Sequence, residues 1–175
     1  ALDMADQLRA LAEQQQEQAH YSSQEARIDL SSIATILNKT MQCLTDIGRP
    51  QTVLTLEDAI DMFADALGPD EPDILAVRGY LAFAYRQVGN FQRTVAIFDA
   101  LLADRTRVLG PNHPDTLSTR GELADAYRQA GNISKAIDMY EVVLADRIRT
   151  LGPKHPDTLT ARNNLAVAHQ KAGNV

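Results

Sequence analysis

Apolar positions along this chain follow the spacing of amphipathic helices, and the pattern repeats. Between residues 72 and 172, apolar residues recur three and four positions apart, in segments separated by glycine or by Gly-Pro. The phrase Leu-Gly-Pro-Asn-His-Pro-Asp-Thr-Leu at 109–117 returns as Leu-Gly-Pro-Lys-His-Pro-Asp-Thr-Leu at 151–159, 42 residues later, and a looser copy fills 67–75. A fixed period of this length predicts stacked helix pairs, because one pair alone cannot bury its apolar face.

Glycine, proline and asparagine mark the ends of the predicted helices. Pro72 and its counterparts in the later copies fit the first helical position, where a missing N–H costs nothing. Gly89 supplies a left-handed residue that ends a helix, and Asn90 has a side chain suited to cap the next one. The predicted helices are 24–47, 52–67, 72–88, 91–108, 114–130, 133–150 and 156–172.

The repeats divide the chain into three parts. Residues 68–175 form an array of two full repeats plus the first helix of a third, so we expect the chain to be part of a longer protein. Residues 24–67 have the spacing of a helix pair without the full phrases, which is typical of a degenerate repeat that caps a stack. Residues 1–23 are expected to be an N-terminal helix or linker, and a helix that packs on an absent neighbour is the alternative.

Composition and charge narrow the range of functions. The net charge of -6 argues against binding to a nucleic-acid phosphate backbone. No apolar run approaches the length of a membrane span, and a cytoplasmic setting is expected. Cys43 is the only cysteine, which excludes an internal disulfide, and we expect it to be buried as a small apolar residue. The sequence contains no Gly-rich phosphate loop and no Ser/His/Asp grouping, so we expect no enzyme activity and no cofactor.

Two histidines lie in the repeated turn, and each has an aspartate two residues further on. This pairing of His113 and His155 with a carboxylate suggests a metal or acid–base role. The looser copy of the turn, however, has Glu71 in the same place. We therefore expect both histidines to have a structural role in the turn. The other histidines are isolated, so no metal site is expected.

The residues within one unit resemble the tetratricopeptide repeat signature. Residues 123–131 read Leu-Ala-x-x-Tyr-x-x-x-Gly, and 136–140 read Ala-x-x-x-Tyr. The 42-residue step and the Leu-Gly-Pro-x-His-Pro-Asp-Thr-Leu phrase are similar to the kinesin-light-chain type of this repeat. The chain departs from the signature where Arg78, Arg120 and Arg162 replace its tryptophan. Over 67–175 the resemblance implies an all-α fold, a right-handed α-solenoid of antiparallel helix pairs.

The resemblance also implies a concave groove that is lined by the first helix of each unit and holds a protein or peptide. Asn163 and Asn164 match asparagines that help to hold an extended peptide in the kinesin-light-chain family, and an amide can both donate to and accept from a peptide backbone. Tyr80 and Phe83 are expected to anchor an apolar side chain. The expected binding residues are Tyr80, Phe83, Arg86, Gln87, Glu122, Asp125, Arg128, Asn163, Asn164, Gln170 and Lys171.

The function implied is a non-catalytic scaffold that binds a protein or peptide in its groove. One alternative is a sensor or regulatory arm of a larger signalling ATPase or transcription regulator, because arrays of this type in bacterial, actinomycete-like sequences often end such ATPases. Self-association as a homo-oligomer through the ends of the solenoid is another, since an unfinished repeat leaves apolar residues uncovered. The groove residues also fit solvated helix faces that bind nothing.

Overall fold

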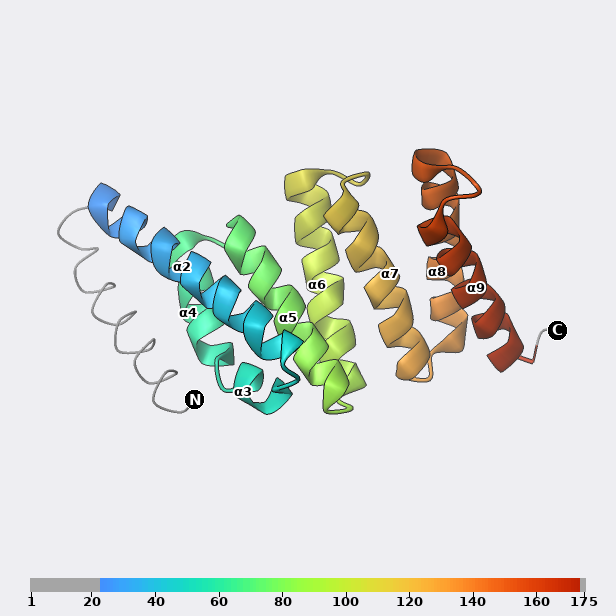
Figure 1. Ribbon diagram of the computed structural model, residues 1–175, viewed down its shortest axis with the longest axis horizontal. Helices are drawn as coiled ribbons and strands as arrows, with labels where there is room; N and C mark the ends of the chain where they lie inside the picture. The colour runs from blue at the N-terminus through green and yellow to red at the C-terminus, as the bar shows by residue number, and fades with distance from the viewer. Residues whose placement is uncertain (1–22, 174–175) are drawn as a thin grey trace. The chain divides into compact units, whose positions relative to one another are not determined.

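The described part of the chain is all-α. A computed structural model describes residues 23–173, and every regular element in this range is an α-helix. The chain divides into two compact units between Gly89 and Asn90. We call residues 23–89 unit 1, which contains helices α2 to α5, and residues 90–173 unit 2, which contains α6 to α9 (Figure 1). The predicted N-terminal helix or linker at 1–23 lies outside the described residues, apart from Ser23.

In unit 1 the last helix packs against the other three. Helices α2 (Ser23–Asp46), α3 (Pro50–Leu54) and α4 (Glu57–Leu67) all contact α5 (Pro72–Gln87). The core of this unit is aliphatic and aromatic, as the spacing of apolar residues predicts. Its fully buried side chains include Leu37, Met41, Val53, Ile60, Phe63, Ile74 and Val77.

One polar contact joins the first and last helices of unit 1. Asp73, in the first turn of α5, accepts hydrogen bonds from Thr35 Oγ1 at 2.5 Å and from Asn38 Nδ2 at 2.6 Å. Both donors lie on α2. An acid in the first turn also interacts favourably with the positive end of its own helix. Asp73 therefore stabilises the start of α5 and links this helix to α2.

The single helix predicted over 52–67 is wrong. The chain forms two helices here, with a turn at Thr55 and Leu56. Thr55 Oγ1 donates to the Thr52 carbonyl at 2.7 Å, and Leu56 N–H donates to the Val53 carbonyl at 3.1 Å. The backbone bond of Leu56 spans three residues instead of four, so the backbone tightens before α4 begins, and the Thr55 side chain occupies the Thr52 carbonyl.

The prediction that Cys43 is buried is also wrong, because Cys43 is exposed. The buried face of α2 passes through Leu30, Ile33, Leu37 and Met41 at intervals of three and four. Cys43 follows Met41 by two positions, which is a rotation of about 200° around the helix. The thiol therefore lies away from the core face.

Unit 2 is a simple succession of four helices, each packed on the next. They are α6 (Phe91–Leu109), α7 (Pro114–Gln129), α8 (Ile133–Leu151) and α9 (Pro156–Lys171). The prediction of these four helices is confirmed, with every boundary within one residue of the predicted one. Short turns join them, so neighbouring helices run in opposite directions (Figure 1).

The turns of unit 2 are capped by side chains. Asn90 accepts from the N–H of Arg93 at 3.2 Å, and Asn132 accepts from the N–H of Lys135 at 3.3 Å. The predicted cap at Asn90 is thus confirmed. Gly131 precedes the second cap with a φ of 84°, a conformation that a side chain would strain.

The two turn histidines are also caps. Nδ1 of His113 accepts from the N–H of Asp115 at 3.2 Å, and Nδ1 of His155 accepts from the N–H of Asp157 at 3.2 Å. Each histidine stands directly before the proline that opens α7 or α9. The predicted structural role of His113 and His155 is therefore confirmed.

Small residues bring α7, α8 and α9 close together around one tyrosine. The buried cluster consists of Ala124, Ala136, Tyr140 and Ala168. Partly buried side chains that pack around it are Tyr127, Ile137, Met139 and Leu165. Tyr140, only 1% exposed, is the largest fully buried side chain of the described chain. Its ring fills the space that the alanines leave, and this packing fixes the position of its hydroxyl.

Candidate functional site

Two adjoining cavities in unit 2 form the candidate site. Both are lined by α7, α8 and α9, and both include Ser118 and Arg147 in their walls. Their volumes are about 360 Å³ and 140 Å³. We call these two adjoining cavities together the α7–α9 cleft. The larger part lies within the size range of protein ligand sites, and the smaller part has room for a single side chain.

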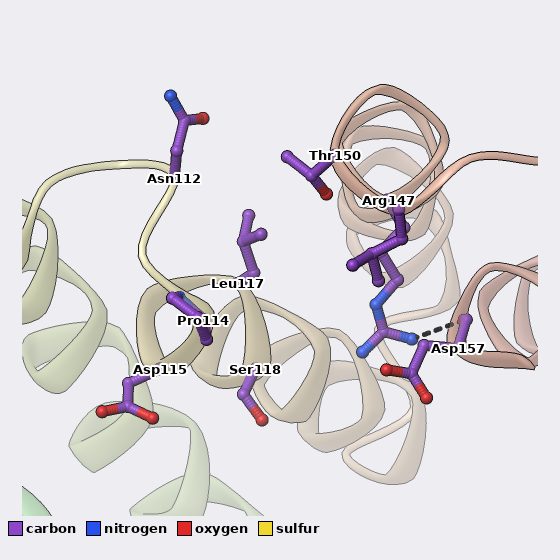
Figure 2. Close-up of a pocket in the computed structure, with 9 residues that line it drawn as sticks. Asn112, Pro114, Asp115, Leu117, Ser118, Arg147, Thr150 and Asp157 are labelled. Atoms are coloured by element: carbon purple, nitrogen blue, oxygen red, sulfur yellow. Dashed lines mark hydrogen bonds between the residues drawn. The ribbon is translucent and has the colours of Figure 1, made fainter. Parts of the chain in front are cut away.

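The larger cavity lies where α7 and α9 begin and α8 ends. Figure 2 shows Leu117 and Thr150 on facing sides, with Asn112 above them and Arg147 next to Asp157. Apolar groups provide much of the wall, and acidic and amide groups lie around them. The lining residues are Asn112, Pro114, Asp115, Leu117, Ser118, Arg147, Thr150, Leu151 and Asp157.

The smaller cavity continues along the three helices. Its lining mixes small residues, which leave the space open, with polar side chains from all three helices. The lining residues are Ser118, Gly121, Glu122 and Asp125 from α7, Tyr140, Val143 and Arg147 from α8, and Thr160, Ala161 and Asn164 from α9.

A hydrogen-bonded triad forms part of the wall of the smaller cavity. The Tyr140 hydroxyl donates to Asp125 Oδ1 at 2.5 Å, and Arg128 Nε donates to the same hydroxyl at 3.2 Å. Arg128 Nη2 also donates to Asp125 Oδ1 at 3.0 Å. Each member thus bonds to both of the others, and the charge of Asp125 is compensated within the triad.

The triad perturbs two acid–base equilibria. Burial raises the pKa of the Tyr140 hydroxyl above its ordinary value, the bond to Asp125 raises this pKa further, and the bond from Arg128 lowers it. The pKa of Arg128 is raised, chiefly by its bond to Tyr140, while burial acts in the opposite direction and Asp125 adds to the rise. Tyr140 therefore stays neutral and Arg128 stays charged over the physiological range.

Ion pairs fix the wall around the end of α8. Arg120 on α7 pairs with Asp146 on α8. Asp146 also accepts from Arg149 Nη2 at 3.2 Å, and Arg149 Nη2 donates to Asn112 Oδ1 at 2.5 Å. These contacts connect α7, α8 and the loop before α7 at the rim of the larger cavity.

Arg147 occupies the junction of the two cavities. Its Nη1 donates to the backbone carbonyl of Asp157 at 2.8 Å, as the dashed line in Figure 2 shows. A Cβ added at Gly121 would lie 3.6 Å from Arg147 Nη2, so the guanidinium lies against α7 at this glycine. Among the described residues, Arg147 is the one cation that lines either cavity.

Three of the predicted binding residues line the smaller cavity together: Glu122, Asp125 and Asn164. Arg128 adjoins it through the triad. Asn163, Gln170 and Lys171 lie exposed on α9 and are not part of the lining. The use of these residues for binding stays a prediction.

The other predicted binding residues lie on α5, in unit 1. Tyr80, Phe83 and Arg86 are partly buried, and Gln87 is exposed. The Arg86 guanidinium carbon lies 4.4 Å from the centre of the Phe83 ring, a cation–π contact between residues one helical turn apart. A single groove lined by these α5 residues and the predicted residues of unit 2 stays a prediction.

The second helix of the pair supplies cleft residues that sequence reasoning missed: Tyr140, Val143 and Arg147. The sequence predicts a concave face made of first helices, so it gives these second-helix residues no place in the site. One sequence signal could have drawn attention to Arg147. Thr119 of one repeat corresponds to Ala161 of the next, 42 residues later, so the later repeat lacks a hydroxyl near its arginine.

Two further properties of the described residues bear on chemistry. Within residues 23–173, no group of three or more His, Cys, Asp or Glu side chains has the arrangement of a metal site. Over the same range, no helix has the length and apolar character needed to cross a membrane.

Part of the chain matches a known protein family. Residues 73–148 match the family profile described as tetratricopeptide repeat. No curated protein matches the chain. Tetratricopeptide repeats are in general non-catalytic scaffolds that mediate protein–protein interaction, and the matched range includes α7 and most of α8.

Solved structures resemble the whole described fold. Two crystal structures of a Podosopora anserina protein, described as a kinesin light chain with nearly identical TPR-like repeats, are 27% identical to this chain and cover 97% of it and 88% of their own chain. The TM-score is 0.69 for one of the two structures, which is of a variant, and 0.68 for the other. BtubC (BKLC) from P. vanneervenii, 14% identical, gives a TM-score of 0.64 and covers 98% of this chain and 67% of its own. The predicted fold class, an all-α solenoid of helix pairs, is thus confirmed.

Proposed function

We propose that the chain is a protein-interaction scaffold that binds an extended segment of a partner protein in the α7–α9 cleft. The observation that carries this proposal is that the two cavities adjoin: they share Ser118 and Arg147 and draw their walls from three successive helices. The likeness to TPR-like repeats supports it, because such repeats generally mediate protein–protein interaction.

The lining suits a peptide in its mixture of apolar and hydrogen-bonding groups. In the larger cavity, Pro114, Leu117 and Leu151 offer an apolar surface for one ligand side chain. In the smaller cavity, Asn164 offers an amide that can both donate to and accept from a peptide backbone. A segment that runs along the cleft would reach both parts in turn.

The test blocks the cleft at a residue that lines both cavities. Ser118 is exposed and lines both cavities, so Ser118→Trp fills the junction without replacing a core side chain. The matched control is Ser134→Trp, since Ser134 is exposed on α8 and lines neither cavity. Peptides are selected from a random display library with the wild-type chain, and their dissociation constants are measured for all three proteins.

Peptides that occupy the cleft should bind wild type and Ser134→Trp equally and should bind Ser118→Trp at least tenfold more weakly. Far-UV circular dichroism confirms that both variants keep the helical fold. Selected peptides that bind all three proteins alike would contradict the proposal, as would a selection that yields no peptide.

A further inference from the structure

Arg147 differs from its counterpart one repeat earlier in a way that bears on ligand recognition. Arg105 Nη1 donates to the Thr119 hydroxyl at 2.7 Å and to the Asp115 carbonyl at 3.4 Å. Arg147 Nη1 donates to the equivalent carbonyl, that of Asp157, at 2.8 Å. In the later repeat, Ala161 occupies the position of Thr119 and has no hydroxyl. Arg147 therefore lacks the second acceptor that Arg105 has.

The missing hydroxyl leaves hydrogen-bond donors of Arg147 directed at the cleft. A guanidinium carries five N–H donors and no acceptor. The single hydrogen bond described for Arg147 uses one of them. Because Arg147 lines both cavities, a segment that follows the cleft has to pass its guanidinium.

The charges around Arg147 favour a neutral acceptor over an anion. Asp115 and Asp157 border the larger cavity, with side chains that are 61% and 62% exposed. A ligand carboxylate at Arg147 would approach these acids and be repelled. A backbone carbonyl carries no net charge and accepts an N–H bond in the same place.

We propose that Arg147 holds a main-chain carbonyl of the bound peptide, and that the replacement of the threonine by Ala161 makes this possible. The proposal rests on the proposed function, because it concerns a ligand in the α7–α9 cleft. Arg147 then contributes affinity that is independent of the ligand's side chains. In the preceding unit, Arg105 is fastened to Thr119 and Asp115 within the protein.

Two variants weaken the interaction by different routes. Arg147→Gln removes the charged donors and should weaken every cleft-binding peptide by roughly tenfold or more, the value of a hydrogen bond to a charged group. Ala161→Thr keeps the arginine and adds the hydroxyl that fastens its counterpart. Position 119 accommodates a threonine at 2% exposure, and Ala161 borders a cavity, so the added atoms have space.

The matched control is Arg107→Gln. Arg107 is exposed on α6 and lines neither cavity. This variant should bind the peptides with wild-type affinity. Thermal melts and far-UV circular dichroism establish that all three variants keep the helical fold.

The experiment uses a peptide obtained from the display selection above. Each backbone carbonyl is replaced in turn by a thiocarbonyl, which is a weaker acceptor, with every side chain unchanged. In wild type, one position should lose affinity several-fold. In Arg147→Gln and in Ala161→Thr, the same replacement should have no further effect, because the bond is already absent.

Three results would overturn the proposal. Arg147→Gln and Arg107→Gln could bind the peptides equally well, or the thiocarbonyl profile could be the same in wild type and Arg147→Gln. Arg147→Gln could also weaken only peptides that contain Asp or Glu, which would identify a side-chain carboxylate as the acceptor. In each case, loss of binding by Ser118→Trp would leave the proposed function intact. Binding that is insensitive to Ser118→Trp, or the absence of any selected peptide, would overturn both the proposed function and the role of Arg147.

Discussion

Removal of the Tyr140 hydroxyl tests whether the triad stabilises the wall of the cleft. Tyr140→Phe keeps the buried ring and deletes the donor to Asp125 and the acceptor for Arg128. A hydrogen bond to a charged group contributes about 1.5–3 kcal/mol. Asp125 and Arg128 keep their own bond at 3.0 Å, so the cost should lie near the lower end, about 1.5 kcal/mol. For a chain of this size, that loss corresponds to a decrease in melting temperature of about 3–6 °C.

Urea unfolding followed by far-UV circular dichroism measures this cost. The midpoint should fall while the slope with urea stays unchanged, because no additional surface is exposed. Tyr127→Phe is the matched control: Tyr127 packs around the same cluster, and its ring lies 5.2 Å from Lys135 Nζ, a contact that a phenyl ring retains. A loss below about 0.5 kcal/mol in Tyr140→Phe, or equal losses in both variants, would refute the assigned role.

The same variant makes a prediction about alkaline pH. The pKa of Tyr140 is raised in the folded chain, chiefly by burial, so the folded state retains this proton when the unfolded state has lost it. The contribution of this proton to the free energy of unfolding is complete below about pH 10, the pKa of a tyrosine in the unfolded chain, and is lost as pH rises above that value. Wild-type stability should therefore fall more steeply above pH 10 than that of Tyr140→Phe, by at most about 1.4 kcal/mol per pH unit. Parallel slopes would contradict the assignment.

Three further substitutions have definite expected outcomes. Gly121→Ala should raise stability by about 0.5–1 kcal/mol in a thermal melt, because the added Cβ makes only an ordinary contact, 3.6 Å from Arg147 Nη2; a lower melting temperature would show that the glycine is required. His155→Ala should cost about 1 kcal/mol in urea unfolding through loss of the cap on Asp157 N–H, and His155→Asn should restore it; equal losses would exclude the capping role. Asp73→Ala should cost about 1–3 kcal/mol in urea unfolding by removing the acceptor of two bonds from α2, and no change would show that these bonds do not contribute.

The repeat made the helices of unit 2 predictable, because local signals agree there with the fold. Proline at the first helical position and asparagine caps recur at the same place in each copy, and the helices begin where these signals predict. Over residues 24–67 of unit 1 the full phrases are absent, and the turn at Thr55 was missed. Its tighter backbone bond joins Leu56 and Val53, two residues that are compatible with a continuous helix.

The cleft was predictable only in part. Glu122, Asp125 and Asn164 were expected from the first-helix pattern, and the structure brings them together. Tyr140 and Arg147 lie on the second helix of the pair, and sequence period alone does not tell which of its residues reach between α7 and α9. That depends on how closely the alanines let the helices approach, which is a property of the packed core.

The most direct test of a peptide-binding cleft is a methyl NMR titration of residues 1–175 with a library-selected peptide. The account predicts that the methyl signals of Leu117, Val143 and Ala161, which line the two cavities, shift on binding. Val142, 49% exposed on the same helix as Val143 and outside the lining, should not shift. Shifts at Val142 without shifts at Leu117, Val143 and Ala161 would contradict the account and locate the ligand elsewhere on the chain.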